Sequence, residues 1–131
     1  IIGNESPAYL PSGVDIDSVG NFLRNYPVVS SFAHPAAGSF PGEGHYKEVL
    51  PPIEIVDKLM PGFIDIGIQA IEINYPGHTE EHRDLLRRWQ SHYNLIETGG
   101  SDCHDTFDRP PGVEGVDENV YQIFKESLDS I

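Results

Sequence analysis

Apolar residues recur along this chain with two different spacings. Four segments carry them three or four positions apart, which places them on one face of an α-helix. Three shorter segments between these are rich in β-branched and aromatic residues, which is typical of buried strands. The predicted helices cover about residues 15–25, 51–60, 80–93 and 117–128, and the predicted strands cover 28–33, 70–75 and 95–98. This alternation predicts an α/β fold in which about three parallel strands are joined by crossover helices.

Capping and breaking residues mark where these elements begin and end. Asp15, Thr79 and Asp117 each precede a predicted helix, where a side-chain oxygen can accept a hydrogen bond from the first turn. Pro61 and the glycine after it should break or kink the second helix. Residues 63–68 fit either a helix or a strand. The predicted loops are 35–47, which is rich in proline and glycine, and 105–116, which is polar.

Each predicted strand stops at glycine or proline, next to a side chain that can bind a metal. His34 follows the first strand, His78 follows the second, and Asp102 and His104 follow the third. In sheets and barrels with parallel strands, chemistry collects at the carboxyl ends of the strands. The three strand ends therefore predict one shared site.

Asp102 and His104 follow two glycines that allow the backbone to turn sharply after the third strand. In an extended segment, side chains two positions apart point the same way. A carboxylate oxygen and an imidazole nitrogen together suit Zn, Mn or Fe. A shared metal cluster would hold His34, Asp102 and His104 within about 8 Å of one another. The alternative is an Asx turn with a surface histidine. Cys103, between the two, should point away and pack as a small apolar residue.

Composition and charge narrow the function classes. The chain has 131 residues, 8 Lys and Arg against 21 Asp and Glu, and a net charge of −13. This charge argues against an extended nucleic-acid partner, whose phosphates need a basic surface. It leaves room for a small phosphorylated substrate, because bound divalent cations can reverse the local sign. One cysteine, no long apolar span and no recognisable export signal lead us to expect a cytoplasmic protein without a membrane partner.

Four segments together resemble the C-terminal half of a PHP (polymerase and histidinol phosphatase) domain, in its branch of predicted metal-dependent phosphoesterases. They are Pro7-Ala8-Tyr9-Leu10-Pro11, Ser31-Phe32-Ala33-His34-Pro35, Ile71-Glu72-Ile73-Asn74-Tyr75-Pro76-Gly77-His78-Thr79 and Gly99-Gly100-Ser101-Asp102-Cys103-His104. The resemblance implies a partial (β/α)₇ barrel with two or three metal ions (Mn, Zn, Fe or Mg) at the carboxyl ends of the strands. It also implies that His34, Asp102 and His104 are metal ligands, and that Asp102 is the catalytic residue that orients the attacking water.

The chain departs from that family at its beginning. The His-x-His motif and the further ligands with which the family begins are absent. We therefore expect residues 1–131 to be the C-terminal part of a PHP domain, weakly active or inactive alone. A sheet of three strands would also have two exposed edges, through which copies of the chain could associate.

Three further residues are candidates for contact with the substrate. His78 could reach a phosphate from the loop after its strand, or it could satisfy backbone groups near the next helix. Glu72 could support the ligands from the barrel interior or be structural, and His45 lies in a Gly-rich loop that could face solvent. His82 and His92 are expected on the surface of the third helix. Three arginines of this helix are expected to interact with its dipole and with glutamates rather than to bind phosphate: Arg83, Arg87 and Arg88.

The sequence is compatible with three functions. The first is a metal-dependent phosphoesterase that hydrolyses a small phosphorylated substrate, such as a nucleotide, with metal-activated water. The second is a non-catalytic structural or interaction module derived from a PHP domain. The third, an accessory domain of a polymerase, is disfavoured because the acidic charge does not suit a DNA channel and no polymerase segment is attached.

Overall fold

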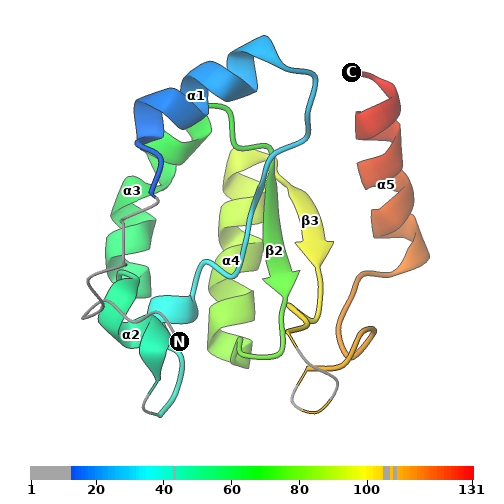
Figure 1. Ribbon diagram of the computed structural model, residues 1–131. Helices are drawn as coiled ribbons and strands as arrows, with labels where there is room; N and C mark the ends of the chain where they lie inside the picture. The colour runs from blue at the N-terminus through cyan, green and yellow to red at the C-terminus, as the bar shows by residue number, and fades with distance from the viewer. Residues whose placement is uncertain (1–12, 43, 105–106, 108) are drawn as a thin grey trace.

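The computed structural model describes residues 13–42, 44–104, 107 and 109–131. The segment 7–11, which contributed to the family resemblance, lies outside these residues. The elements in chain order are α1 (Ile16–Asn25), β1 (Ser31–Phe32), the short 3₁₀ turn η1 (Ala37–Ser39), α2 (His45–Val49), α3 (Ile53–Asp65), β2 (Ala70–Asn74), α4 (Glu80–Tyr93), β3 (Ile96–Gly99) and α5 (Glu118–Asp129) (Figure 1). The predicted α/β class is confirmed, and the arrangement is consistent with part of a barrel. Within the described residues, no helix has the length and apolar character that a membrane span requires.

The three strands form one parallel sheet in the order β1-β2-β3. Ala70 in the central strand is paired with Ser31 on one side and with Ile96 on the other. The register of β2 against β3 shifts near its end, so that Asn74 faces Gly99. Because all strands run the same way, their carboxyl ends meet at one edge of the sheet (Figure 1). The predicted convergence of the strand ends is therefore present.

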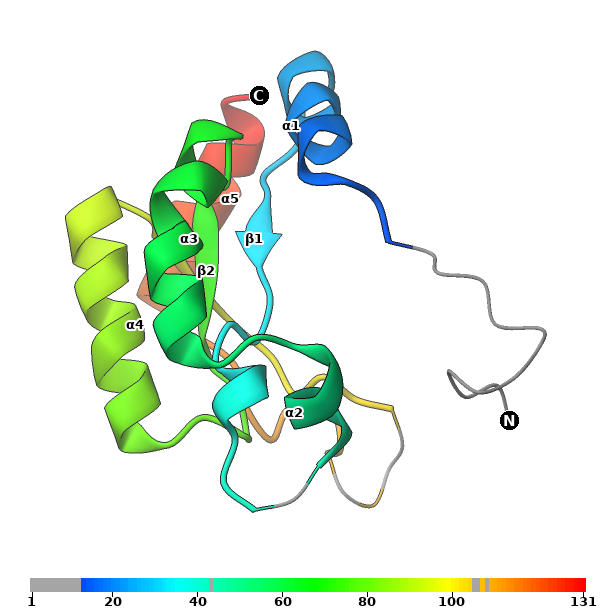
Figure 2. The ribbon, with the colours of Figure 1, turned by 90° about the vertical axis from the view of Figure 1, so that its left-hand side faces the viewer.

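The hydrophobic core lies between one face of the sheet and two helices. Figure 2 shows α3 and α4 on the same side of β2. The buried residues of this cluster come from β2, α3, α4 and the segments beside them: Ala36, Ile53, Val56, Met60, Ile71, Ile73, Leu86, Trp89 and Leu95. Side chains alternate along a strand, so Glu72 points to the other face, whereas Asn74, beyond the register shift, is bonded by Arg83 of α4. Across that face Ser31 Oγ lies 2.8 Å from Thr98 Oγ1.

The first strand is shorter than the sequence predicted. Only Ser31 and Phe32 form β1, whereas the predicted strand covered 28–33. The extended conformation cannot continue to His34, whose φ of 32° turns the chain out of the sheet before Pro35. On the other side, Ser30 still accepts bonds from the backbone amides of Gln69 and Ala70. The short strand therefore brings His34 out of the ladder directly beside the end of β2.

One other local prediction was wrong. Residues 35–47, expected as a loop, contain η1 and the beginning of α2. Of the two outcomes predicted at Pro61, a break or a kink, the break does not occur, because α3 continues to Asp65. Pro61 and Gly62 are exposed, while Met60 before them is buried and Phe63 after them packs against the core. Packing on both sides of the proline therefore offsets the hydrogen bond that it cannot donate.

The last helix begins where the sequence predicted. Asp117 caps it by accepting a 2.9 Å hydrogen bond from the amide of Val120. No residue of α5 is buried among those described, and the side chains of Ile123 and Leu128 are about half exposed. The apolar face of α5 is therefore only partly covered by β3, against which this helix lies.

Candidate metal centre

The turn after β3 depends on Gly99. A β-carbon at this position would lie 2.8 Å from both Asn74 Cβ and the Gly115 carbonyl oxygen, closer than real β-carbons approach other atoms. The glycine thus allows β2, β3 and the segment before α5 to meet. This close approach positions the chain that leads to Asp102.

Asp102 and His104 are neighbours, although not by the predicted route. Residues 100–103 are not a strand, and Asp102 has a φ of 48° in the left-handed region, which aspartate tolerates better than most residues. His104 Nδ1 lies 3.6 Å from Asp102 Oδ1 and 2.8 Å from the Asp102 carbonyl oxygen. A left-handed turn therefore brings the two side chains together where an extended segment was expected. Cys103 is exposed, so the prediction that it packs inside was wrong.

The second oxygen of Asp102 is surrounded by donors that the sequence analysis did not identify. Arg109 Nη1 lies 2.6 Å from Asp102 Oδ2, and the Tyr75 hydroxyl donates to the same oxygen at 3.1 Å. The Tyr46 hydroxyl lies 3.5 Å from it. One carboxylate oxygen is thus occupied by protein donors, while the other lies toward His104. The only sequence signal for Arg109 is its position as a lone basic residue in the polar loop after the Asp-x-His motif.

His34 lies at the end of β1 and is tied to β2. Its backbone amide donates a 2.6 Å hydrogen bond to Glu72 Oε2. Its ring lies beside the rings of Tyr46 and Tyr75, with centroid distances of 5.7 and 5.6 Å. These are the two tyrosines whose hydroxyls approach Asp102. His34 and Asp102, which follow different strands, therefore both lie beside Tyr46 and Tyr75.

Glu72 supports the turn at His34 from the middle of the sheet. Burial raises the pKa of its carboxyl, and the hydrogen bond from the His34 amide opposes that rise. This position on the face away from the core is compatible with the supporting role considered for Glu72.

His78 is enclosed by the protein. It is 6% exposed, and its Nδ1 lies 2.8 Å from the Ile73 carbonyl oxygen. Burial lowers the pKa of His78 to about 4, so the ring is neutral at pH 7 and donates from Nδ1. The rings of Phe40, Tyr75 and His82 surround it. This geometry matches the structural alternative, a histidine that satisfies a backbone group before α4. His45, the third candidate for substrate contact, begins α2, and its side chain lies outside the described part of the structure.

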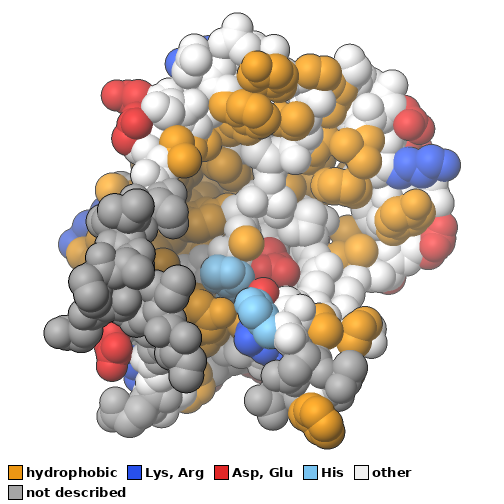
Figure 3. Space-filling model, viewed as in Figure 1, with side chains coloured by type: hydrophobic (Ala, Val, Ile, Leu, Met, Phe, Trp, Pro, Cys, Tyr) orange, Lys and Arg blue, Asp and Glu red, His pale blue; other side chains and the backbone are white. Residues whose placement is uncertain are grey.

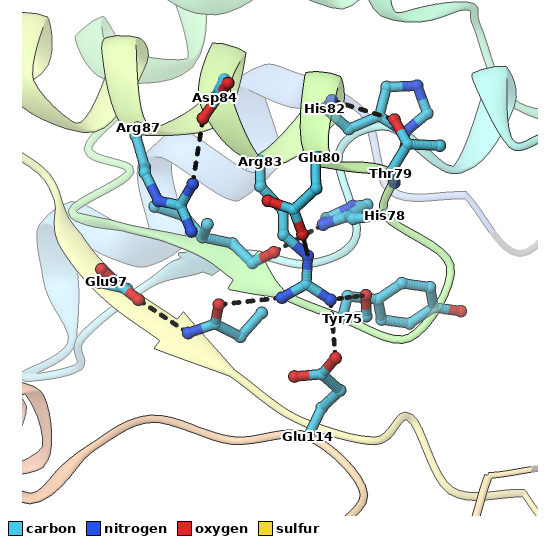
Figure 4. A network of polar contacts seen from close by, with 12 residues as sticks. Tyr75, His78, Thr79, Glu80, His82, Arg83, Asp84, Arg87, Glu97 and Glu114 are labelled. Atoms are coloured by element: carbon cyan, nitrogen blue, oxygen red, sulfur yellow. Dashed lines mark hydrogen bonds and ion pairs between the residues drawn. The ribbon is translucent and has the colours of Figure 1, made fainter.

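Arg83 organises the backbone behind the site (Figure 4). Its guanidinium donates to the Tyr75 carbonyl at 3.1 Å, to Asn74 Oδ1 at 3.1 Å and to Glu114 Oε1 at 2.7 Å. Asn74 in turn donates to Glu97 Oε1 at 2.8 Å. The predicted pairing of Arg83 with a glutamate is confirmed. Its wider role, which links α4 and β2 with the segment before α5, was not predicted.

The remaining charged residues of α4 divide into two groups. Arg87 pairs with Asp84 at 3.1 Å on the exposed surface, where a glutamate partner was expected, and Arg88 is exposed. His92 is exposed, as predicted. His82 was wrongly predicted as a surface residue. It is partly buried and completes a capping box, in which its Nδ1 accepts from the Thr79 amide while Thr79 Oγ1 accepts from the His82 amide.

The side chains at this end of the sheet supply some, but not all, of the ligands that a divalent cation needs. Asp102 Oδ1 and the His104 ring are close enough to share one ion, although His104 Nδ1 donates to the Asp102 carbonyl oxygen here and would have to give up that bond to be the ligand. Oxygen with imidazole nitrogen is a common ligand combination. Among the described residues, no three His, Cys, Asp or Glu side chains form a group able to hold a metal. The assignment of His34, Asp102 and His104 as joint ligands therefore stays a prediction, and a complete centre needs further donors. Figure 3 shows that histidine, acidic and basic side chains lie together near the middle of the molecular face that is turned to the viewer.

Comparison with known proteins identifies a solved structure with a similar fold but no matching family. No family model matches the chain, and no curated protein matches it. A solved structure from Bifidobacterium adolescentis, of a protein assigned as a metal-dependent phosphoesterase, superposes with a TM-score of 0.67 at 20% sequence identity. The match covers 95% of this chain and 41% of that one, so the chain spans about two fifths of the length of its structural neighbour. The chain thus has the α/β fold found in one part of that structure.

Proposed function

We propose that this chain forms the C-terminal part of a PHP-type metal-dependent phosphoesterase that hydrolyses a small phosphorylated substrate, such as a nucleotide. The observation that carries the proposal is the 3.6 Å approach of Asp102 Oδ1 and His104 Nδ1 at the end of the third parallel strand. The fold shared with the bifidobacterial protein supports the same reading.

Each side chain at the strand ends has a role in this proposal. Asp102 and His104 would hold one divalent cation (Mn, Zn, Fe or Mg), and His34 would contribute to the cluster of two or three ions from the neighbouring strand. When bound, such ions lower the pKa of water and neutralise charge on phosphoryl oxygens. Asp102 would also orient the attacking water. Glu72 holds the turn at His34 through its 2.6 Å hydrogen bond.

The net charge of the chain favours a small substrate, and the candidate contacts to it lie near Asp102 and on α2. The chain has a net charge of −13, so an extended polyanion would be repelled outside the immediate site. Arg109, next to Asp102 and His104, supplies positive charge within the site. His45 remains a candidate for substrate contact from α2. His78 is not part of the proposal, because it is buried and bonded to Ile73.

The proposal is tested by metal analysis and a phosphatase assay. The protein is purified, loaded with Mn²⁺ or Zn²⁺ and assayed with nucleoside monophosphates and an aryl phosphate, both as this chain and as any longer protein that contains it. We expect bound metal, and activity that falls by orders of magnitude in Asp102→Ala. Asp84→Ala removes an exposed carboxylate from α4 and should leave the activity unchanged. Absence of both metal binding and turnover in every form would refute the proposal.

A second candidate is an interaction module that self-associates. Apolar hollows of about 270 Å³ lie beside both outer strands, one lined by Val14, Ile16 and Phe32 near β1 and one by Val116, Tyr121 and Phe124 near β3. Edge strands with apolar surroundings favour pairing with a second copy. Sedimentation analysis over a range of concentrations distinguishes the two functions. The module predicts a concentration-dependent dimer that Phe124→Lys abolishes, without metal binding.

A further inference from the structure

Three side chains form a closed triangle at the candidate metal centre. Arg109 Nη1 lies 2.6 Å from Asp102 Oδ2 and 2.6 Å from the Tyr75 hydroxyl, and that hydroxyl lies 3.1 Å from the same Oδ2. Two close donors, with the Tyr46 hydroxyl at 3.5 Å as a third, therefore converge on one oxygen of the carboxylate. The other oxygen, Oδ1, lies 3.6 Å from His104 Nδ1, which Arg109 Nη2 also approaches to 3.4 Å.

A carboxylate held in this way has one defined orientation. An aspartate at the end of a loop ordinarily rotates about its last bond, whose energy wells are broad. Here rotation would break the hydrogen bonds at Oδ2, and a charged hydrogen bond is stronger than a neutral one. The two oxygens of Asp102 thus have different environments before any ligand binds.

The two partners of Asp102 are themselves fixed. Tyr75 is 1% exposed, its ring is stacked on Phe40 at 5.3 Å, and its carbonyl accepts from Arg83. Arg109 stands in the segment that Arg83 holds through the 2.7 Å ion pair with Glu114. Both donors are therefore anchored to the sheet and to α4.

We propose that Arg109 and Tyr75 are positioning residues, which lock Asp102 so that Oδ1 alone is presented to a divalent cation beside His104. This inference rests on the proposed function. It assigns monodentate ligation to Asp102 and gives Arg109 a role through the carboxylate rather than through the reacting atoms. Outer partners that orient metal ligands commonly change metal affinity by about 10- to 100-fold when removed.

If Arg109 instead competes with the cation, its removal should have the opposite effect on metal binding. A guanidinium beside a carboxylate could simply occupy the place of the cation and compete with it. Removal of the positive charge would then tighten metal binding. If Arg109 positions Asp102, its removal weakens metal binding despite the lost repulsion, so the sign of the change separates the two roles.

The experiment measures Mn²⁺ binding by calorimetry in the 131-residue chain and in four variants. Arg109→Met should weaken binding by about 10- to 100-fold, and Arg109→Lys should recover part of the loss because it retains one charged donor. Tyr75→Phe should give a smaller loss. Arg87→Met, which removes an exposed arginine paired with Asp84, is the matched control and should bind as the wild type does.

A second measurement does not depend on the metal. Crystal structures of the metal-free wild type and of Arg109→Met should show one Asp102 carboxylate orientation in the former and several in the latter. Unchanged or tighter Mn²⁺ binding, or a single carboxylate orientation in Arg109→Met, would overturn the positioning role. Failure of the wild type to bind Mn²⁺ would count against the proposed function instead, and the comparison of orientations would still decide the role of Arg109.

Discussion

The indole nitrogen of Trp89 donates a 2.6 Å hydrogen bond to Asp57 Oδ1. Trp89 lies on α4 and is 5% exposed, whereas Asp57 lies on the outer side of α3. The bond joins the two helices that cover the same face of the sheet (Figure 2). It also satisfies the one polar group of a large aromatic side chain in the core.

Asp57→Ala should therefore destabilise the protein more than a neighbouring surface substitution. The change leaves a buried indole N–H without its acceptor, which costs about 1–3 kcal/mol. Lys58→Ala, at the next position of α3 and exposed, should cost less than about 0.5 kcal/mol. Urea unfolding followed by the fluorescence of Trp89, the single tryptophan, measures both. Equal free energies of unfolding for the two variants would show that the bond contributes nothing.

Gly99→Ala should separate the strand ends. Its new methyl group would lie 2.8 Å from the Gly115 carbonyl oxygen, a backbone atom that cannot move alone. Overpacking of this kind costs about 1–3 kcal/mol, and it should also displace the segment that carries Asp102. The matched control is Gly62→Ala in α3, where nothing lies within 4 Å of the new carbon. This change should stabilise the helix by about 0.5–1 kcal/mol, so thermal unfolding should shift in opposite directions for the two variants.

Arg83→Met tests the network behind the site. The Arg83 side chain is 14% exposed, and its loss would remove a donor from Glu114, from Asn74 and from the Tyr75 carbonyl, which would keep only its bond from the His78 amide among those described. We expect a loss of about 3 kcal/mol, at the lower end for a broken buried pair because Glu114 is partly exposed. Arg87→Met removes an exposed ion pair of α4 and should change stability by less than about 1 kcal/mol. Chemical denaturation of both proteins gives the comparison, and similar midpoints would contradict the role assigned to Arg83.

The buried His78 should make stability depend on pH. Its pKa is lowered to about 4 in the folded protein, whereas an unfolded histidine has a pKa of about 6.5. Between these values the unfolded chain binds more protons, so the folded state is fully favoured above pH 6.5 and loses stability as the pH falls toward 4. The loss should reach about 2–3 kcal/mol.

His78→Asn isolates this contribution. The asparagine amide can still donate to the Ile73 carbonyl but does not titrate. Its stability should therefore vary less between pH 6.5 and pH 4 than that of the wild type. Burial raises the pKa of Glu72 and lowers that of His82, with opposite effects on the slope, and both are present in each protein. Parallel stability profiles for the two proteins would refute the assignment.

The sequence predicted best the elements whose local signals agree. In α4, the capping threonine, the acids of the first turn and the apolar stripe all indicate the helix Glu80–Tyr93, and the structure has those bounds. The strand β2 is likewise close to its predicted range. The extent of β1 and the continuity of α3 through Pro61 depend on tertiary contacts, which periodicity does not contain.

The residues of the candidate site were likewise predictable only where a local sequence motif indicates them. Asp102 and His104 share a short motif, and their proximity follows from two residues of separation. Arg109, Tyr46 and the Arg83 network reach the site from a loop, a short helix and the back of the sheet. No spacing rule links such positions, because the contacts depend on how the loops pack. The left-handed turn at Asp102 was missed for the same reason.

The three strands lie in the sheet in the order in which they occur in the sequence, and this order favours folding from local contacts. Each ladder joins strands that are consecutive in sequence, so no strand must wait for a distant segment. The β2–α4–β3 unit, residues 70–99, contributes Ile71, Ile73, Leu86 and Trp89 to the core and can collapse as a local nucleus. The two-residue β1 would then join a surface that already exists. Amides of β2 should accordingly be the first to resist hydrogen exchange during refolding, and those of β1 among the last.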